Sequence, residues 1–157
     1  MEIYGVSFDM VGKQPIILLK TQSGNRYLPI WIGSAEATAI MTRLQGVETP
    51  RPMTHDLLSN VVRQLHGEVI KVSVTELREN TFIAAITLKT DAEEIEIDAR
   101  PSDALALAVR EDVPIFAAES VIADSALEFI PDAQSSDDVV EKFREFLDDV
   151  SPEDFAG

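Results

Sequence analysis

The sequence contains no cysteine and only two histidines among its 157 residues. The lack of cysteine excludes disulfides, thiolate nucleophiles and cysteine-ligated zinc or iron–sulfur sites, and two histidines are too few for a histidine-rich metal site. No apolar run reaches the roughly 18–20 residues that a transmembrane helix needs. The N-terminal segment MEIYGVSFDM is acidic and alternating, unlike a signal peptide. These absences predict a soluble, cytoplasmic protein with no membrane partner.

Basic residues are also scarce. The chain carries 13 lysines and arginines against 28 aspartates and glutamates, a formal charge of −15 at pH 7. This balance argues against a protein held to nucleic acid by a broadly basic surface, because such affinity comes mainly from neutralised phosphates. The excess is uneven: residues 1–120 hold 11 basic and 17 acidic side chains, whereas residues 121–157 hold 2 and 11.

The last part of the chain, residues 131–157, is predicted to form an acidic arm. Residues 131–136 are polar and typical of a linker. Residues 137–150 then place apolar side chains at helical spacing, which predicts an amphipathic helix. These side chains are Val139, Val140, Phe143, Phe146, Leu147 and Val150. Two interpretations are open: a solvated face with one docking stripe, or an arm that binds a protein partner or inhibits the domain.

Residues 1–130 are predicted to form one α+β domain, because 45% of the residues are hydrophobic and can build a substantial core. Alternating or continuous apolar segments predict strands at 3–10, 15–20, 26–32, 69–75, 82–88, 95–99 and 114–117. Pro29 places the third strand at an edge or a bulge. Three helices are predicted to begin at the caps Ser34, Thr54 and Ser102. Runs of strands with grouped helices favour a mostly antiparallel sheet with three main helices packed on it, with the C-terminal amphipathic helix in addition.

Polar residues gather where the three predicted helices begin, in the strings GSAE (33–36), RPMTHD (51–56) and DARPSD (98–103). Free backbone amides and the helix dipole make such ends anion sites. The candidate anion-binding residues are Arg51, Arg100, Thr54 and Ser102, because an arginine ahead of the helix could hold a phosphate with two hydrogen bonds.

The alternative for these three segments is structural. Ser34, Thr54 and Ser102 would then be ordinary caps. The acidic residue of each first turn would complement the helix dipole, worth roughly 0.3–1 kcal/mol each; these residues are Glu36, Asp56 and Asp103.

His55 falls in the first turn of the second predicted helix. A neutral imidazole there could act as a general base or as a metal ligand, or His55 could be a surface residue that follows a cap. Carboxylates that converge would select magnesium, manganese or calcium over zinc, and the candidates are Glu36, Asp56, Asp98 and Asp103. No GxGxxG, GxxxxGK[ST], HExxH or GxSxG motif is present, so no organic cofactor is expected.

Several separated strings resemble the bifunctional nuclease (BFN) domain family over roughly residues 1–130. They are LPIWIGSAEATAI (28–40), RPMTHDLL (51–58), ENTFIAAI (79–86), IDARPSDALALAVR (97–110) and PIF (114–116). The resemblance implies an α+β domain, prone to self-association, in a family named for nuclease activity on DNA and RNA. The shared positions are Trp31, Gly33, Glu36, Arg51, Pro52, Thr54, His55, Asp56, Arg100, Ser102 and Asp103.

Two hypotheses follow from the resemblance and the residues together. In the first, the protein is a metal-dependent nuclease: Glu36, Asp56 and Asp103 hold magnesium or manganese. In this hypothesis Arg51 and Arg100 clamp the phosphate, and the catalytic residues are His55 and the same three acids. In the second, the protein is a non-catalytic homo-oligomer that regulates a partner or binds a small anion, a role that the acidic arm suits better.

Overall fold

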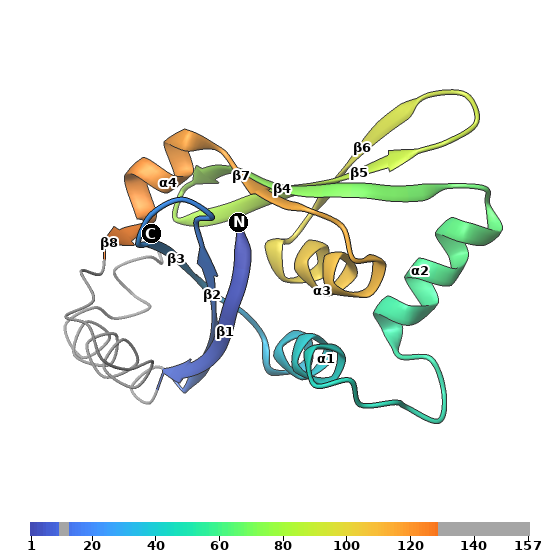
Figure 1. Ribbon diagram of the computed structural model, residues 1–157, viewed down its shortest axis with the longest axis horizontal. Coiled ribbons are helices and arrows are strands. Elements are labelled where there is room, and N and C mark those ends of the chain that lie inside the picture. Colours follow the sequence, from blue (N-terminus) through green and yellow to red (C-terminus); the bar gives the residue numbers. More distant parts are fainter. Residues whose placement is uncertain (10–12, 129–157) are drawn as a thin grey trace.

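The computed structural model describes residues 1–9 and 13–128. Within these residues, four helices and eight strands form the α+β fold that the sequence predicts, but the strands make two four-stranded sheets instead of one (Figure 1). The described part contains no helix that is long and apolar enough to cross a membrane. The predicted linker and amphipathic helix of residues 131–157 lie outside the described residues.

The first sheet has the order β1-β2-β3-β8 and is antiparallel throughout. Its strands are β1 (Glu2–Asp9), β2 (Gln14–Lys20), β3 (Arg26–Trp31) and β8 (Leu127–Glu128). The continuous apolar run of β2 is buried on both faces of the sheet, as such a run predicts. Strand β8 pairs only with Arg26 and Tyr27, so β3 is an edge strand at Pro29. An edge is where a residue without a backbone N–H is tolerated.

The second sheet has the order β6-β5-β4-β7. Its strands are β4 (Glu68–Arg78), β5 (Thr81–Lys89), β6 (Glu94–Ala99) and β7 (Ile115–Ala117), and β7 alone runs parallel to its neighbour, β4. The β4–β5 hairpin turns through Glu79 and Asn80, whose φ angles are 48° and 56°. Positive φ at both central residues is typical of a type I′ turn, which suits the twist of a hairpin.

Helix α3 (Pro101–Glu111) is the centre of the fold. It packs against β4 and β5 on one side and against α1 (Ser34–Leu44) and α2 (Thr54–Gln64) on the other (Figure 1). A helix that is apolar all round is typical of such a buried position, and residues 104–108 of α3 are at most 1% exposed. Its leucines join side chains of both sheets in one core, so α3 holds the two sheets and two helices together. The short helix α4 (Glu119–Ser125) then leads into β8.

Three details of the helices differ from the prediction. The caps are Gly33, Met53 and Arg100, so Ser34 and Thr54 are first helical residues and Ser102 lies one residue further in. None of the three helices has a side-chain oxygen as its cap; in α2 the Asp56 carboxylate accepts a hydrogen bond from the Met53 amide instead.

Helix α2 also buries a different face from the one that its sequence favours. The buried residues are polar, His55 and Ser59, whereas most of its apolar stripe is exposed to solvent. The exposed residues of that stripe are Leu57, Leu58, Val61 and Leu65. The reason lies in α3, which supplies charged partners to the polar face.

Candidate functional site

A polar cluster forms where the first turns of α1, α2 and α3 approach one another. Its members are Glu36, His55, Arg100 and Asp103. We call these four residues the Arg100 cluster. Since α1 and α2 both pack against α3, residues that lie up to 67 positions apart in the sequence meet in one place.

The Arg100 guanidinium joins the two carboxylates of the cluster. Its Nη2 donates a hydrogen bond to Glu36 Oε1 at 2.7 Å. Its Nε and Nη2 bind the two oxygens of Asp103 at 2.7 Å and 3.1 Å, a bidentate pair within the first turn of α3. Asp103 Oδ1 also lies 3.0 Å from Nε2 of His55. The chain of contacts therefore runs from α1 through α3 to the imidazole on α2.

These contacts bias the charge states in the cluster. Burial raises the pKa of Asp103, but the hydrogen bonds from Arg100 and His55 outweigh burial, and the net result is a pKa below the ordinary value of 3.8. The hydrogen bond to Asp103 in turn raises the pKa of Arg100, with Glu36 adding to the effect. Asp103 is therefore a stable carboxylate at neutral pH, suited to orient an imidazole by accepting a hydrogen bond from its Nε2–H group.

Gly33 explains how Glu36 reaches Arg100. The Glu36 carboxyl group folds back over the start of α1, so that a Cβ built at Gly33 would collide with Glu36 Oε2. A side chain at position 33 would therefore push the carboxylate away from the guanidinium. The GSAE string thus combines a glycine that leaves space with an acid that fills it.

Asp56 belongs to a separate ion pair. It bonds Nε of Arg110, a residue that is 8% exposed and that also donates to the carbonyl oxygens of Ala106 (2.8 Å) and Ala39 (3.3 Å). Burial raises the pKa of Asp56, but the Met53 amide and Arg110 more than offset this, so the net shift is downward. Asp56 thereby anchors α2 to α3 and lies outside the Arg100 cluster.

The sequence prediction missed Arg110 and a second polar contact between the same helices. Ser59 donates to Glu111 Oε1, and Arg63 Nη2 donates to Glu111 Oε2 at 2.8 Å. The available signal was the spacing of His55, Ser59 and Arg63, which lie four residues apart and therefore on one face of α2. That face carries the polar residues that meet α3.

The two Arg-Pro motifs have different surroundings. Arg51 is exposed in the irregular segment before α2, and its side chain forms no ion pair with any described residue. Its carbonyl accepts a hydrogen bond from the Thr49 hydroxyl at 2.9 Å, and Thr54 is exposed as well. Of the predicted anion-binding residues, Arg100 and Ser102 line a common pocket, which Arg51 and Thr54 do not.

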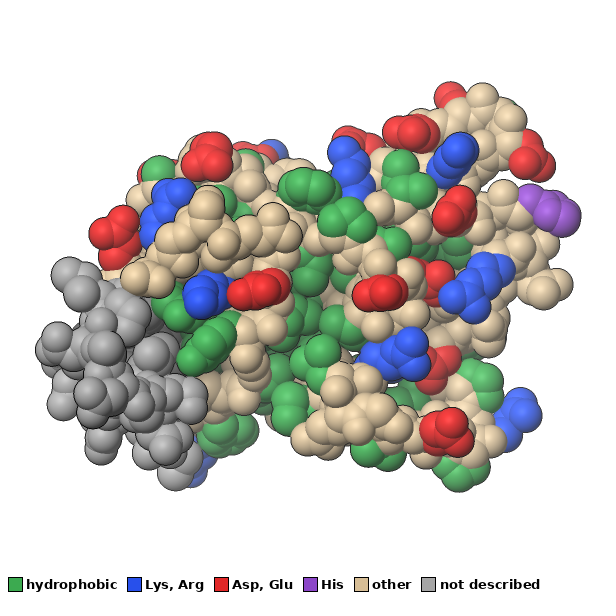
Figure 2. All heavy atoms as spheres, in the orientation of Figure 1, with side chains coloured by type: hydrophobic (Ala, Val, Ile, Leu, Met, Phe, Trp, Pro, Cys, Tyr) green, Lys and Arg blue, Asp and Glu red, His purple; other side chains and the backbone are tan. Residues whose placement is uncertain are grey.

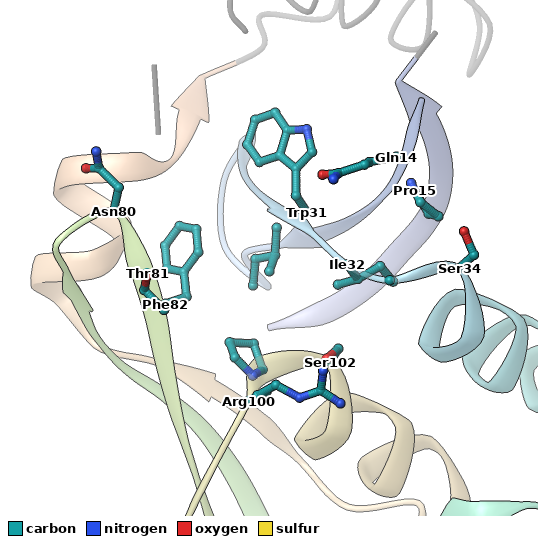
Figure 3. Close-up of a pocket in the computed structure, with 13 residues that line it drawn as sticks. Gln14, Pro15, Trp31, Ile32, Ser34, Asn80, Thr81, Phe82, Arg100 and Ser102 are labelled. Carbon is teal, nitrogen blue, oxygen red and sulfur yellow. The ribbon is translucent and has the colours of Figure 1, made fainter. Parts of the chain in front are cut away.

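This pocket has a volume of about 610 Å³ and opens beside the Arg100 cluster (Figure 3). Three parts of the chain form most of its wall: the end of β3 with Trp31, the β4–β5 turn with Phe82, and the start of α3 with Arg100. Ser34 and Ser102 bring hydroxyl groups from the first turns of α1 and α3. Two of the three predicted helix N-termini, those of α1 and α3, therefore meet at a cavity, with one of the two predicted arginines.

The predicted metal ligands do not form a metal site as they are arranged. Glu36 and Asp103 are engaged by Arg100, whereas Asp56 binds Arg110 and the Met53 amide. In the residues that the structure describes, no three histidine, aspartate or glutamate side chains gather as a metal-binding group. A divalent cation would have to compete with guanidinium groups for these oxygens.

The fold and the cluster define an α+β protein with a histidine–aspartate–arginine chain of contacts beside a pocket. A family model, the bifunctional nuclease domain, matches residues 17–129. The chain belongs to the bifunctional nuclease domain family, as the resemblance indicates.

Individual relatives fall into two groups. An uncharacterized protein of Mycobacterium tuberculosis (strain H37Rv) is 43% identical, over 99% of this chain and 96% of that protein. Bifunctional nuclease 1 of Arabidopsis thaliana is 30% identical over 64% of this chain, and bifunctional nuclease 2 of Oryza sativa subsp. japonica is 29% identical over 65%. The match spans about a third of each of these plant proteins, 32% and 33% of their lengths.

Proposed function

We propose that this protein is a nuclease that hydrolyses phosphodiester bonds of DNA and RNA at the Arg100 cluster. The observation that carries the proposal is the contact between His55 and Asp103 beside an exposed guanidinium. The Arg100 side chain is 67% exposed to solvent, whereas the His55 side chain is 10% exposed. The names of the plant relatives and of the family support the same activity.

Each member of the cluster has a role in this proposal. Arg100 uses Nε and Nη2 for its carboxylate partners, and no described residue accepts a hydrogen bond from Nη1. Nη1 is therefore the group that binds a phosphoryl oxygen and stabilises the charge that develops on it. Glu36 and Asp103 hold the guanidinium in place.

His55 is the general base in this proposal. With Nε2 bonded to Asp103, the imidazole keeps Nδ1 for general base catalysis on a water molecule or, in RNA, on a ribose 2′-hydroxyl. Asp103 selects this tautomer and stabilises the imidazolium that results. The bond between phosphorus and the leaving oxygen then breaks as the new oxygen–phosphorus bond forms, and the leaving oxygen takes a proton from the His55 imidazolium or from solvent water.

The test is cleavage of labelled single-stranded DNA and RNA by the purified full chain. His55→Ala should lower the rate by at least about 100-fold, the smaller end of what acid–base catalysis contributes. His66→Asn is the matched control, because His66 is exposed at the end of α2 with φ 59°, which asparagine tolerates. Equal cleavage by wild type and His55→Ala, after identical purification, would assign the activity to a contaminant.

A second candidate is a non-catalytic, homo-oligomeric regulatory or anion-binding protein. In its favour, the ion pairs of Arg100 join α1 to α3 and His55 joins α2 to α3, as a purely structural network would. The exposed apolar stripe of α2 supports self-association, because large exposed apolar patches are typical of interfaces. If this candidate is right, the chain cleaves nothing, His55→Ala lowers the melting temperature, and light scattering gives a multiple of the chain mass.

We also expect a cytoplasmic location, a homo-oligomer and a protein partner for the acidic arm. The face of the molecule in Figure 2 carries interspersed acidic and basic side chains, so this face does not suggest a broad nucleic-acid interface. Any nucleic acid is therefore expected to be held at a local site.

A further inference from the structure

The pocket beside Arg100 is unusual in its charge. Arg100 is the one charged residue among the described residues that line it, although the chain carries 28 acidic side chains. A phosphate that enters this pocket therefore meets a guanidinium and no carboxylate in the described wall. The two carboxylates that pair with this guanidinium, Glu36 and Asp103, do not line the pocket, so on the pocket side the guanidinium is the charged group that a nucleotide phosphate would contact.

The rest of the wall suits a nucleobase. Figure 3 shows the indole of Trp31 and the ring of Phe82 around the same cavity, with the Arg100 side chain at another side of it. Aromatic faces bind bases by stacking, which contributes about 1–3 kcal/mol per base. The amide groups of Gln14 and Asn80 add donors and acceptors for the edge of a base.

We propose that this pocket binds one unpaired base of a single-stranded nucleic acid, next to the phosphate that Arg100 holds. The proposal rests on the proposed nuclease function and names its substrate class. A volume of about 610 Å³ lies within the usual range for pockets that bind small molecules. A base in a duplex is paired and stacked, and it would have to be flipped out at a cost of a few kcal/mol before it could enter.

The single cation in the wall has a measurable consequence. Binding to single strands weakens with salt by a slope of about −0.7 in log K against log salt for each phosphate neutralised. One phosphate contact at Arg100 therefore predicts a shallow slope near that value. A protein that binds along a basic groove would show a slope several times steeper.

The experiment uses the full chain and a phosphorothioate-linked oligothymidine, which resists cleavage, either single-stranded or annealed to its complement. Trp31 is the only tryptophan, so its fluorescence reports contact with a base directly. The single strand should quench Trp31 and bind more tightly than the duplex. Phe82→Leu, which keeps an apolar side chain but removes the aromatic face, should weaken binding about 5- to 150-fold.

Phe116→Leu is the matched control, because Phe116 is a half-exposed phenylalanine on β7 that does not line the pocket. Phe82→Tyr should restore most of the affinity. The inference is overturned if the duplex binds as tightly as the single strand, if Trp31 fluorescence does not respond, or if Phe82→Leu binds like wild type.

These outcomes are separate from those of the cleavage assay. Selective binding with Trp31 quenching but without cleavage would support the base pocket and refute the proposed nuclease function. Cleavage of single and double strands at equal rates, unaffected by Phe82→Leu, would support the nuclease and refute the pocket. A melting curve for each variant shows that the protein measured is folded.

Discussion

Replacing Arg100 by glutamine distinguishes a guanidinium that serves a ligand from one that serves the fold. The change removes three hydrogen bonds, one to Glu36 and two to Asp103. The Arg100 side chain is 67% exposed, whereas its partners Glu36 and Asp103 are 15% and 29% exposed, so water replaces the bonds of the guanidinium more fully than those of the carboxylates. Exposed ion pairs contribute about 0–1 kcal/mol, which corresponds to a fall in melting temperature of about 4 °C or less for a chain of this size.

The effect on binding should be larger than the effect on stability. A hydrogen bond between a charged donor and a phosphate contributes about 1.5–3 kcal/mol, so Arg100→Gln should raise the Kd for the oligothymidine about 10- to 150-fold. Fluorescence anisotropy measures the Kd, and thermal unfolding monitored by circular dichroism measures the stability of the same preparation.

Arg51→Gln is the matched control for this experiment. Arg51 precedes a proline and a helix, as Arg100 does, but it is exposed, forms no ion pair with a described residue and does not line the pocket. Its substitution should leave both the Kd and the melting temperature nearly unchanged. If Arg100→Gln instead lowers the melting temperature by more than about 5 °C and binds oligothymidine like wild type, the guanidinium only joins helices and the reasoning is wrong.

Four further predictions concern acid stability, Gly33, metal dependence and the acidic arm. Asp56 and Asp103 have pKa values below 3.8 in the folded protein, so in acid the unfolded chain binds more protons than the folded one. The melting temperature should therefore fall as the pH drops from about 5 to about 3. Asp103→Asn should make that fall smaller. Gly33→Ala should displace the Glu36 carboxylate and lower cleavage, while Ala35→Gly, in the same turn, should spare it. Cleavage should survive EDTA because the candidate carboxylates are engaged by arginines; loss of activity that magnesium or manganese restores would favour the metal hypothesis. A chain that ends at Ile130 should retain a cooperative thermal transition, and loss of cooperativity would place the acidic arm in the core.

Local pattern was sufficient for most of the secondary structure. Alternating residues 3–10 and the doubly apolar run 15–20 predicted β1 and β2, and the positions of three helices followed from spacing and from glycine or proline at their ends. The caps were wrong by one or two residues because the helices use Gly33, Met53 and Arg100 in extended conformations. Strand β8 was missed, since two residues carry no periodicity.

The division into two sheets is a tertiary result. Strand β7 has three residues and pairs in parallel with β4, and β8 has two and pairs with β3. The strand at β7 was predicted from its local pattern, but which strand each short segment pairs with depends on where α3 and α4 deliver the chain. The sequence therefore predicted the fold class but not how its strands are shared between sheets.

The sequence by itself determined which residue types stand at the helix N-termini, and it singled out Glu36, His55, Arg100 and Asp103 together with Arg51 and Asp56. Only the tertiary structure decided that the first four meet and that the other two do not. The physical reason is that RPMTHD and RPSD have nearly the same local chemistry, whereas ion pairing depends on which helix lies opposite. Helix α3 presents Arg110 to Asp56 and Asp103 to His55, and no pattern along the chain encodes that packing.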